Sequence, residues 1–225
     1  MKNFNTSDIT FKYEFEAGLG PWEEGRYNRE FLMNIFYEDE YPENEEVKLI
    51  GKVKFYIIYI DQAINDGYDL MEIFDHFEYT FRHGQDFFDF DTEEIKEDIQ
   101  EFYSYAIEGS NICLLEDIEI IPEFRGNKLA AKAIKDIVFH FSAGCCLFVI
   151  QPYPLQFDAH KRSEDWDEQL KLNDLSTDEE ASIKKLKKYY KSIGFDQIKG
   201  YKDLLFYNPA RKNERMDGID LEESR

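Results

Sequence analysis

The chain has 225 residues, and its 27 basic and 48 acidic side chains give a formal net charge of −21. This charge argues against nonspecific binding to nucleic acid or to an anionic membrane, because phosphate contacts need lysine and arginine. Hydrophobic residues make up 43% of the chain and aromatic residues 16%. That content excludes a disordered acidic polymer and predicts one large domain over residues 1–208, followed by a charged tail at 209–225.

The three cysteines, Cys113, Cys145 and Cys146, form no C-x-x-C motif, and the four histidines show no metal-ligand spacing. This pattern is typical of buried thiols in a reducing cytoplasm, and we expect no metal site. The N-terminal residues have no apolar signal core, and the chain has no run of 18 apolar residues. We therefore expect a cytoplasmic protein that does not cross a membrane.

The first half of the chain is expected to be β-rich at its start and helical later. Strands are predicted from alternating or β-branched apolar residues, and helices from apolar residues at a spacing of three to four. The aromatic and acidic segment 81–90 is interpreted as a loop that either lines a pocket or packs on the core. The predicted elements are strands at 9–15, 31–37 and 47–60, and helices at 68–77 and 92–107, the last with a capping box of Asp91 and Glu94.

The second half predicts an α/β unit. A strand, a helix and a continuously apolar strand follow one another, which implies a parallel strand pair. Residues 152–176 are either a lid over a site or a surface elaboration. The predicted elements are strands at 113–121 and 145–150, helices at 127–142 and 177–193, the latter with a Ser176–Glu179 capping box, and a hairpin of 195–201 with 203–208.

The junction between the strand 113–121 and the following helix carries the strongest functional signal. A strand-to-helix junction points several free backbone N–H groups at one place, and the helix dipole adds positive potential there. Arg125 and Lys128 add two cations in a strongly acidic chain. The junction is thus a candidate site for a pyrophosphate, or else an ordinary charged turn.

The segment LLEDIEIIPEFRGNKLA resembles motif A of the GNAT superfamily of N-acetyltransferases. In that family a Gln/Arg-x-x-Gly-x-Gly/Ala loop binds the pyrophosphate of coenzyme A through backbone amides. Arg125 and Ala130 match the first and last positions, whereas Lys128 replaces the middle glycine. The later segment LKKYYKSIGF resembles the second signature of the family, and its tyrosine matches Tyr190.

The resemblance covers residues 111–208 as a cofactor-binding core, with 1–110 as a variable N-terminal half that carries extra helices. It implies an α/β, GNAT-like acyl-CoA N-acyltransferase fold. Such a fold has a mixed, mostly antiparallel central sheet, a parallel strand pair at the cofactor cleft and helices on both faces. A homodimer through the C-terminal strands is left open.

The resemblance also implies acetyl-CoA as cofactor and direct attack of an amine on its thioester. Glu116 would be the general base and Tyr190 the acid that protonates the thiolate. Glu116 could equally pair with a neighbouring lysine or arginine, and Tyr190 could be core packing. The implied cofactor-binding residues are Ile120, Ile121, Arg125, Gly126, Asn127, Lys128, Leu129 and Ala130.

Asp117 is expected on the opposite face of the strand from Glu116, unless a bulge intervenes. It is the second choice as base, or a contact for a substrate ammonium. The acceptor would be a primary amine of a small molecule or a peptide, with a cationic one favoured by the acidic composition. Two further hypotheses are an inactive GNAT-like module that binds an acyl-CoA or a protein, and an acidic decoy of nucleic acid.

Overall fold

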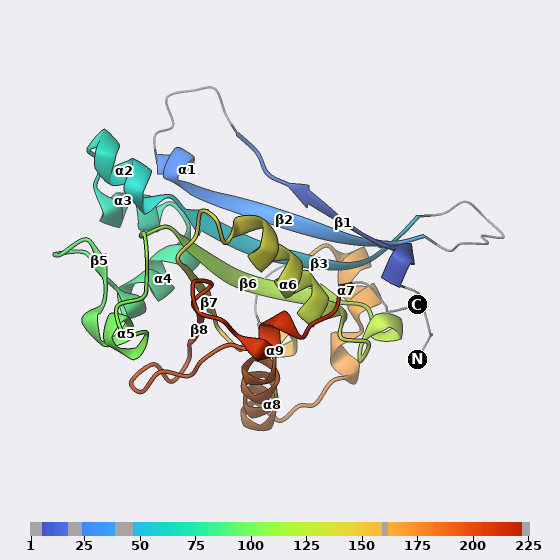
Figure 1. The fold of residues 1–225 in the computed structure, drawn as a ribbon. Helices are drawn as coiled ribbons and strands as arrows, with labels where there is room; N and C mark the ends of the chain where they lie inside the picture. The colour runs from blue at the N-terminus through green and yellow to red at the C-terminus, as the bar shows by residue number, and fades with distance from the viewer. Residues whose placement is uncertain (1–5, 18–23, 39–46, 159–161, 222–225) are drawn as a thin grey trace.

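A six-stranded sheet forms the centre of the protein, in the order β1-β2-β3-β6-β7-β8 (Figure 1). The structure is a computed structural model that describes residues 6–17, 24–38, 47–158 and 162–221. The strands of this sheet are β1 (Ile9–Glu14), β2 (Asn28–Tyr37), β3 (Lys48–Ile58), β6 (Ile112–Ile120), β7 (Leu147–Ile150) and β8 (Leu205–Tyr207).

All neighbouring strands pair antiparallel except β6 and β7, which are parallel. Helix α6 (Leu129–Phe141) connects these two strands. The predicted α/β architecture with a mixed, mostly antiparallel sheet and one parallel pair is therefore confirmed.

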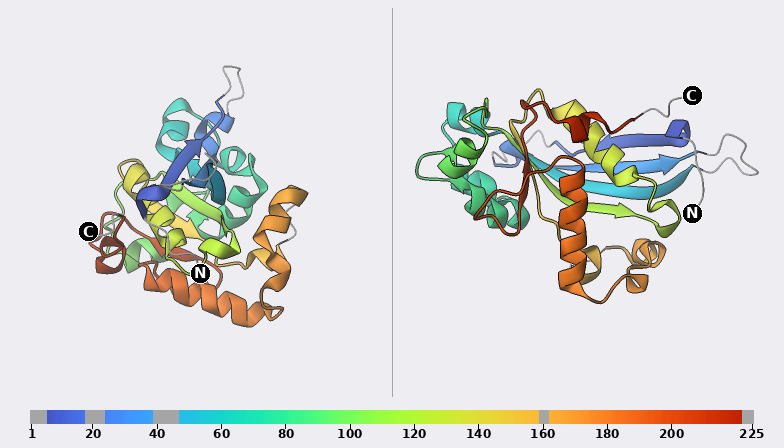
Figure 2. Two further views of the ribbon diagram at one scale, coloured as in Figure 1. Left: turned by 90° about the vertical axis from the view of Figure 1, so that its right-hand side faces the viewer. Right: turned by 60° about the horizontal axis from the view of Figure 1, so that its bottom comes forward.

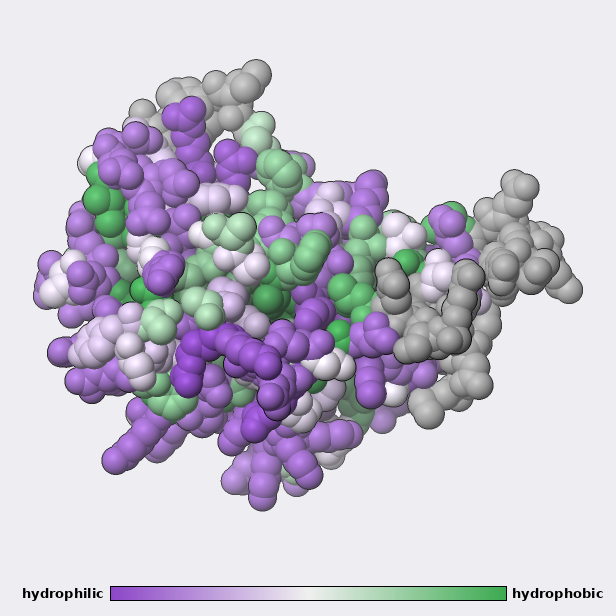
Figure 3. All heavy atoms as spheres, viewed as in Figure 1, coloured by the Kyte–Doolittle hydropathy of each residue, from purple (hydrophilic) through white to green (hydrophobic). Residues whose placement is uncertain are grey.

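Helices cover both faces of the sheet, and β7 illustrates why its sequence is continuously apolar. Phe148 and Ile150 pack in the cluster that includes residues of α6, whereas Leu147 and Val149 pack in the cluster that includes residues of α2 to α5. A strand buried on both faces has no solvent-facing side that would require polar residues. Hydrophilic side chains cover most of the surface seen in Figure 3, with hydrophobic ones in scattered groups between them.

The helices include a group at one end of the sheet and a pair, α7 and α8, that extends from one side of it (Figure 2). No helix in the described ranges is both long and apolar enough to cross a membrane. The remaining helices are α1 (Glu24–Tyr27), α2 (Ile60–Asp66), α3 (Leu70–Asp75), α4 (Glu78–Phe87), α5 (Glu97–Phe102), α7 (Glu164–Leu170), α8 (Glu179–Ser192) and α9 (Glu214–Asp217).

Two predictions for the first half are wrong. The segment 81–90 is mostly helical, because it forms the larger part of α4. The predicted helix 92–107 is shorter than expected and comprises only α5. The predicted capping box of Asp91 and Glu94 is absent. In its place the carboxylate of Asp89 accepts hydrogen bonds from the amides of Asp91 and Thr92 in a turn. This turn leads into a two-stranded sheet of β4 (Phe88–Asp89) and β5 (Glu94–Ile95).

The C-terminal segment also differs from expectation. The predicted hairpin is reduced to β8, which pairs with β7, and to a single bridge between Asp196 and Phe206. The amide of Ala181 donates to Asp178, which therefore caps α8 in place of the predicted capping box. Within the segment expected as a tail, α9 is folded and its Met216 is buried in the core.

Candidate functional site

The parallel strands β6 and β7 part in the middle of β6. Their pairing covers four residue pairs and ends at Leu115 opposite Ile150, whereas β6 continues to Ile120. Pro152 follows the end of β7 and has no backbone N–H with which to extend the ladder. Because β6 continues for five residues beyond Leu115, and five residues of extended strand span about 16 Å, its backbone borders an elongated gap there.

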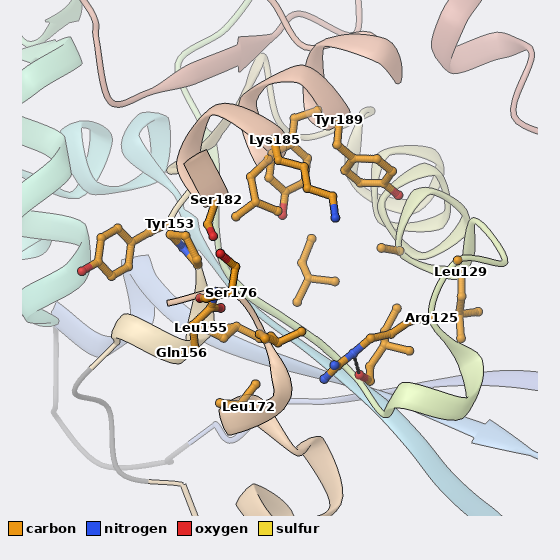
Figure 4. A pocket seen from close by; sticks show the side chains of 18 of the residues that line it. Arg125, Leu129, Tyr153, Leu155, Gln156, Leu172, Ser176, Ser182, Lys185 and Tyr189 are labelled. Atoms are coloured by element: carbon orange, nitrogen blue, oxygen red, sulfur yellow. Dashed lines mark hydrogen bonds between the residues drawn. The ribbon is translucent and has the colours of Figure 1, made fainter. Parts of the chain in front are cut away.

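A cavity of about 440 Å³ fills this gap (Figure 4). Its walls come from β6, the first turn of α6, helix α8 and residues 153–156 and 172–176. Most of its lining is apolar, and charged groups are few. The charged side chains at its wall are Glu116, Arg125, Lys128 and Lys185.

A bulge in β6 brings two carboxylates to one face of the sheet. Lys54 lies opposite Asp117 and Phe55 lies opposite Leu115, so Glu116 is the extra residue in the pairing with β3. Cross-strand neighbours share a face, and Lys54 also contacts the carboxylate of Glu116. The expected separation of Glu116 from Asp117 on opposite faces therefore does not hold.

Glu116 is buried and paired. Its side chain is 5% exposed, and one oxygen lies 2.8 Å from the Nζ of Lys54 and accepts a hydrogen bond of 2.8 Å from the hydroxyl of Tyr56. Lys54 also lies 3.2 Å from Glu30, which is half-exposed. Burial lowers the pKa of Lys54, but these two carboxylates outweigh burial and raise it. The ion pair with a neighbouring lysine, which was the alternative prediction for Glu116, is therefore present.

Asp117 lies beside this pair in a partly buried position. Burial first, and then the neighbouring charge of Glu116, raise the pKa of Asp117 to about 6. Its charged neighbour on the other side is Arg162, 3.7 Å away. A carboxyl group with this pKa exchanges protons near neutral pH, which is the property that a general base needs.

The opposite part of the cavity is cationic. The Nε of Arg125 donates to the carbonyl of Ile120 at 2.7 Å and its Nη2 donates to that of Leu170 at 2.6 Å. These contacts use two of the five N–H groups of the guanidinium. Lys185 of α8 extends its ammonium into the cavity from the other wall (Figure 4).

The loop before α6 contains two residues in the left-handed region of backbone conformation. Gly126 has φ of 82°, and Lys128, directly before the helix, has φ of 57° and ψ of 14°. This left-handed conformation favours glycine, and in this chain Lys128 adopts it. Arg125, Gly126, Lys128, Leu129, Ala130 and Ile120 all line the cavity.

Two of the expected cofactor contacts are engaged elsewhere. The amide of Ile121 donates to the carbonyl of Ile50 at 3.0 Å within the sheet, so it does not face the cavity as a free donor. The side chain of Asn127 lies 3.4 Å from the carbonyl of Phe124, which it donates to. Neither residue belongs to the lining of the cavity.

Tyr190 lies at the wall of the cavity and also packs in the core. It lines the cavity, yet it is only 8% exposed and its ring packs against those of Tyr189 and Phe195. Burial raises the pKa of Tyr190 well above its usual range, so its hydroxyl is protonated at neutral pH and can donate a hydrogen bond. Tyr189 also lines the cavity.

Both ends of the insertion 152–176, at residues 153–156 and 172–176, form part of the cavity wall. Leu155, Leu172 and Leu175 supply apolar contacts there, and Arg162 and Trp166 bind the segment to Glu119 of β6. The two prolines at the exit of β7 are the sequence signal for the parting of the strands, but nothing in the insertion itself predicts that it closes a cavity.

Among the residues that the structure describes, no group of three or more His, Cys, Asp or Glu side chains is arranged to hold a metal ion. The groups that line or adjoin the cavity are carboxylates, cations, tyrosine hydroxyls and backbone amides. In comparisons with known proteins, no family model matches the sequence, and no curated protein matches it at a significant level.

Proposed function

We propose that the chain is an acetyl-CoA-dependent N-acetyltransferase of the GNAT type, with a GNAT-like acyl-CoA N-acyltransferase fold. The observation that carries the proposal is the parting of the parallel strands β6 and β7 next to the first turn of α6, with a cavity along the gap. A linear thioester cofactor fits this shape, because its amide groups would pair with the backbone of β6 beyond Leu115 in place of β7.

The cationic end of the cavity fits the phosphates of the cofactor. Arg125, Lys128 and Lys185 lie at its wall in a chain whose net charge is −21. The free N–H groups at the start of α6 add donors and positive potential at the same place. An excess of positive charge at one cavity in such an acidic protein supports an anionic ligand.

The carboxylate end fits the reaction. Bound acetyl-CoA would supply the thioester carbonyl on which the amine of the acceptor forms its new C–N bond as the C–S bond breaks. Glu116 would accept the proton of the attacking ammonium, with Asp117 as the second candidate or as a contact for a cationic acceptor. Tyr190 would protonate the departing thiolate.

The acceptor in this proposal is a primary amine of a small molecule or a peptide. Glu116 and Asp117 on one face, with Glu30 nearby, support a cationic acceptor over an acidic one. A cytoplasmic location remains part of the proposal.

A catalytically inactive acyl-CoA-binding module is the second candidate. The ion pair between Glu116 and Lys54 favours it, because a carboxylate held by an ammonium is a weaker base. This candidate predicts binding of acetyl-CoA without turnover.

Calorimetric titration with acetyl-CoA tests the proposal. We expect saturable binding by the wild-type protein and binding weaker by roughly tenfold or more in Lys185→Glu, because a charge-assisted phosphate contact becomes a repulsion. Lys184→Glu is the matched control, since Lys184 is exposed on the same helix and does not line the cavity, and it should bind like the wild type.

Absence of binding at millimolar acetyl-CoA would contradict the proposal. If binding is found, release of free thiol with a panel of amines separates the enzyme from the inactive module. Glu116→Gln and Tyr190→Phe should then lower turnover while retaining binding.

A further inference from the structure

The hydroxyl of Tyr79 lies at the point where β6 and β7 part. It donates a hydrogen bond of 2.9 Å to the carbonyl of Leu115, the last residue of β6 that pairs with β7. The backbone amide of Gln151, the first residue after β7, also acts on this hydroxyl and partly offsets the effect of burial on the pKa of Tyr79. The Tyr79 hydroxyl therefore lies at the apex of the gap, beside the last paired residue of β6 and the first residue after β7.

The ring of Tyr79 contacts the tyrosine that holds Glu116. It stacks on the ring of Tyr56 with centroids 5.7 Å apart and an interplanar angle of 24°. The hydroxyl of Tyr56 in turn donates to Glu116 at 2.8 Å. Tyr79 thus connects the apex of the gap with the group that holds Glu116.

Helix α4 presents Tyr79 from a rigid position. Thr80, His83, Gly84 and Phe87 of α4 are buried, and a Cβ on Gly84 would lie 2.3 Å from the ring of Phe74. Such a close approach between α4 and α3 allows little movement of the helix. Burial, followed by the charges of Glu116 and Asp117, raises the pKa of Tyr79, so its hydroxyl remains a donor at neutral pH.

We propose that Tyr79 is a positioning residue, which fixes where the cleft between β6 and β7 begins and so places the thioester of the cofactor beside Glu116. This inference rests on the proposed function. It adds a role for the helices between β3 and β6, because α4 supplies the side chain at the apex. Tyr79 acts through the Leu115 carbonyl and Tyr56 and takes no part in proton transfer.

Tyr79→Phe tests the inference, because it keeps the ring and removes only the hydroxyl. We expect acetyl-CoA to bind up to about tenfold more weakly, as one hydrogen bond that fixes the apex is lost. Binding of adenosine 3′,5′-bisphosphate, which carries the nucleotide phosphates without the thioester arm, should not change. Lys185→Glu should weaken both ligands.

Tyr201→Phe is the matched control, since its hydroxyl donates to the exposed Asp98 at 2.6 Å. It should bind both ligands like the wild type. Equal acetyl-CoA affinity in Tyr79→Phe and wild type would overturn the inference alone, and so would a parallel loss of both ligands with a lowered melting temperature. Absence of acetyl-CoA binding in the wild type would overturn the proposed function as well.

Discussion

Arg162→Met is expected to lower the free energy of unfolding by about 3–5 kcal/mol, because it leaves a buried carboxylate without its cation. The side chains of Arg162 and Glu119 are 9% and 8% exposed and form an ion pair. Arg162 also lies 3.5 Å from Asp158 and 3.7 Å from Asp117. Denaturation by urea at pH 7 measures the loss.

A double variant separates the cost of the unpaired charge from the cost of lost packing. Adding Glu119→Gln to Arg162→Met should restore most of the stability, since the amide is uncharged. Its carbonyl oxygen can still accept the bond that the Nε1 of Trp166 donates to Glu119 at 2.6 Å. A loss of less than about 1 kcal/mol in the single variant would place this contact among ordinary surface ion pairs and contradict the account.

Stability that depends on pH is expected from His83. This side chain is 3% exposed, and neither ring nitrogen makes a hydrogen bond within the described part of the chain. Burial, and then the nearby guanidinium of Arg82, lower the pKa of His83 from 6.5 to about 4. The unfolded chain therefore binds more protons than the folded protein between these two pH values, and folding is disfavoured as the pH falls through that window.

The size of the effect follows from the shift. Between pH 6.5 and 4 the free energy of unfolding of the wild type should fall by about 3 kcal/mol more than that of a variant without this imidazole. His83→Leu and His83→Gln should both lack this component, because neither side chain titrates, although one is apolar and the other polar. Urea denaturation across the pH range measures it, and parallel profiles for the wild type and both variants would contradict the assignment.

Helix α6 and strand β7 could be predicted because local patterns determine them. The apolar period of α6 and the continuous apolar run of β7 allow one interpretation each, and both elements form within two residues of the predicted bounds. The prediction of a terminal hairpin was wrong because β8 pairs with β7. This pairing is long-range, and the local turn residues carry no signal for it.

Helix α4 was missed because its buried stripe is chemically mixed. Thr80, His83 and Gly84 lie on the buried face with Phe87, so the stripe carries little apolar signal. Gly84 has a packing reason, the ring of Phe74, that only the tertiary structure reveals. The sequence therefore could not indicate that this segment supplies Tyr79 to the apex of the cleft.

The candidate site was predicted in part. Glu116, Arg125, Lys128 and Tyr190 do line one cavity. The bulge at Glu116 depends on the pairing of β6 with β3, and the ion pair with Lys54 joins residues far apart in the chain, so neither has a local sequence signal.

Amide hydrogen exchange of the wild-type protein, with and without acetyl-CoA, tests most directly whether the cleft between β6 and β7 binds the cofactor. The account predicts slower exchange at residues 126–130 before and within the first turn of α6, and at residues 116–120 of β6, with little change at β1. Binding that leaves these two segments unprotected, or that protects a different surface, would contradict it.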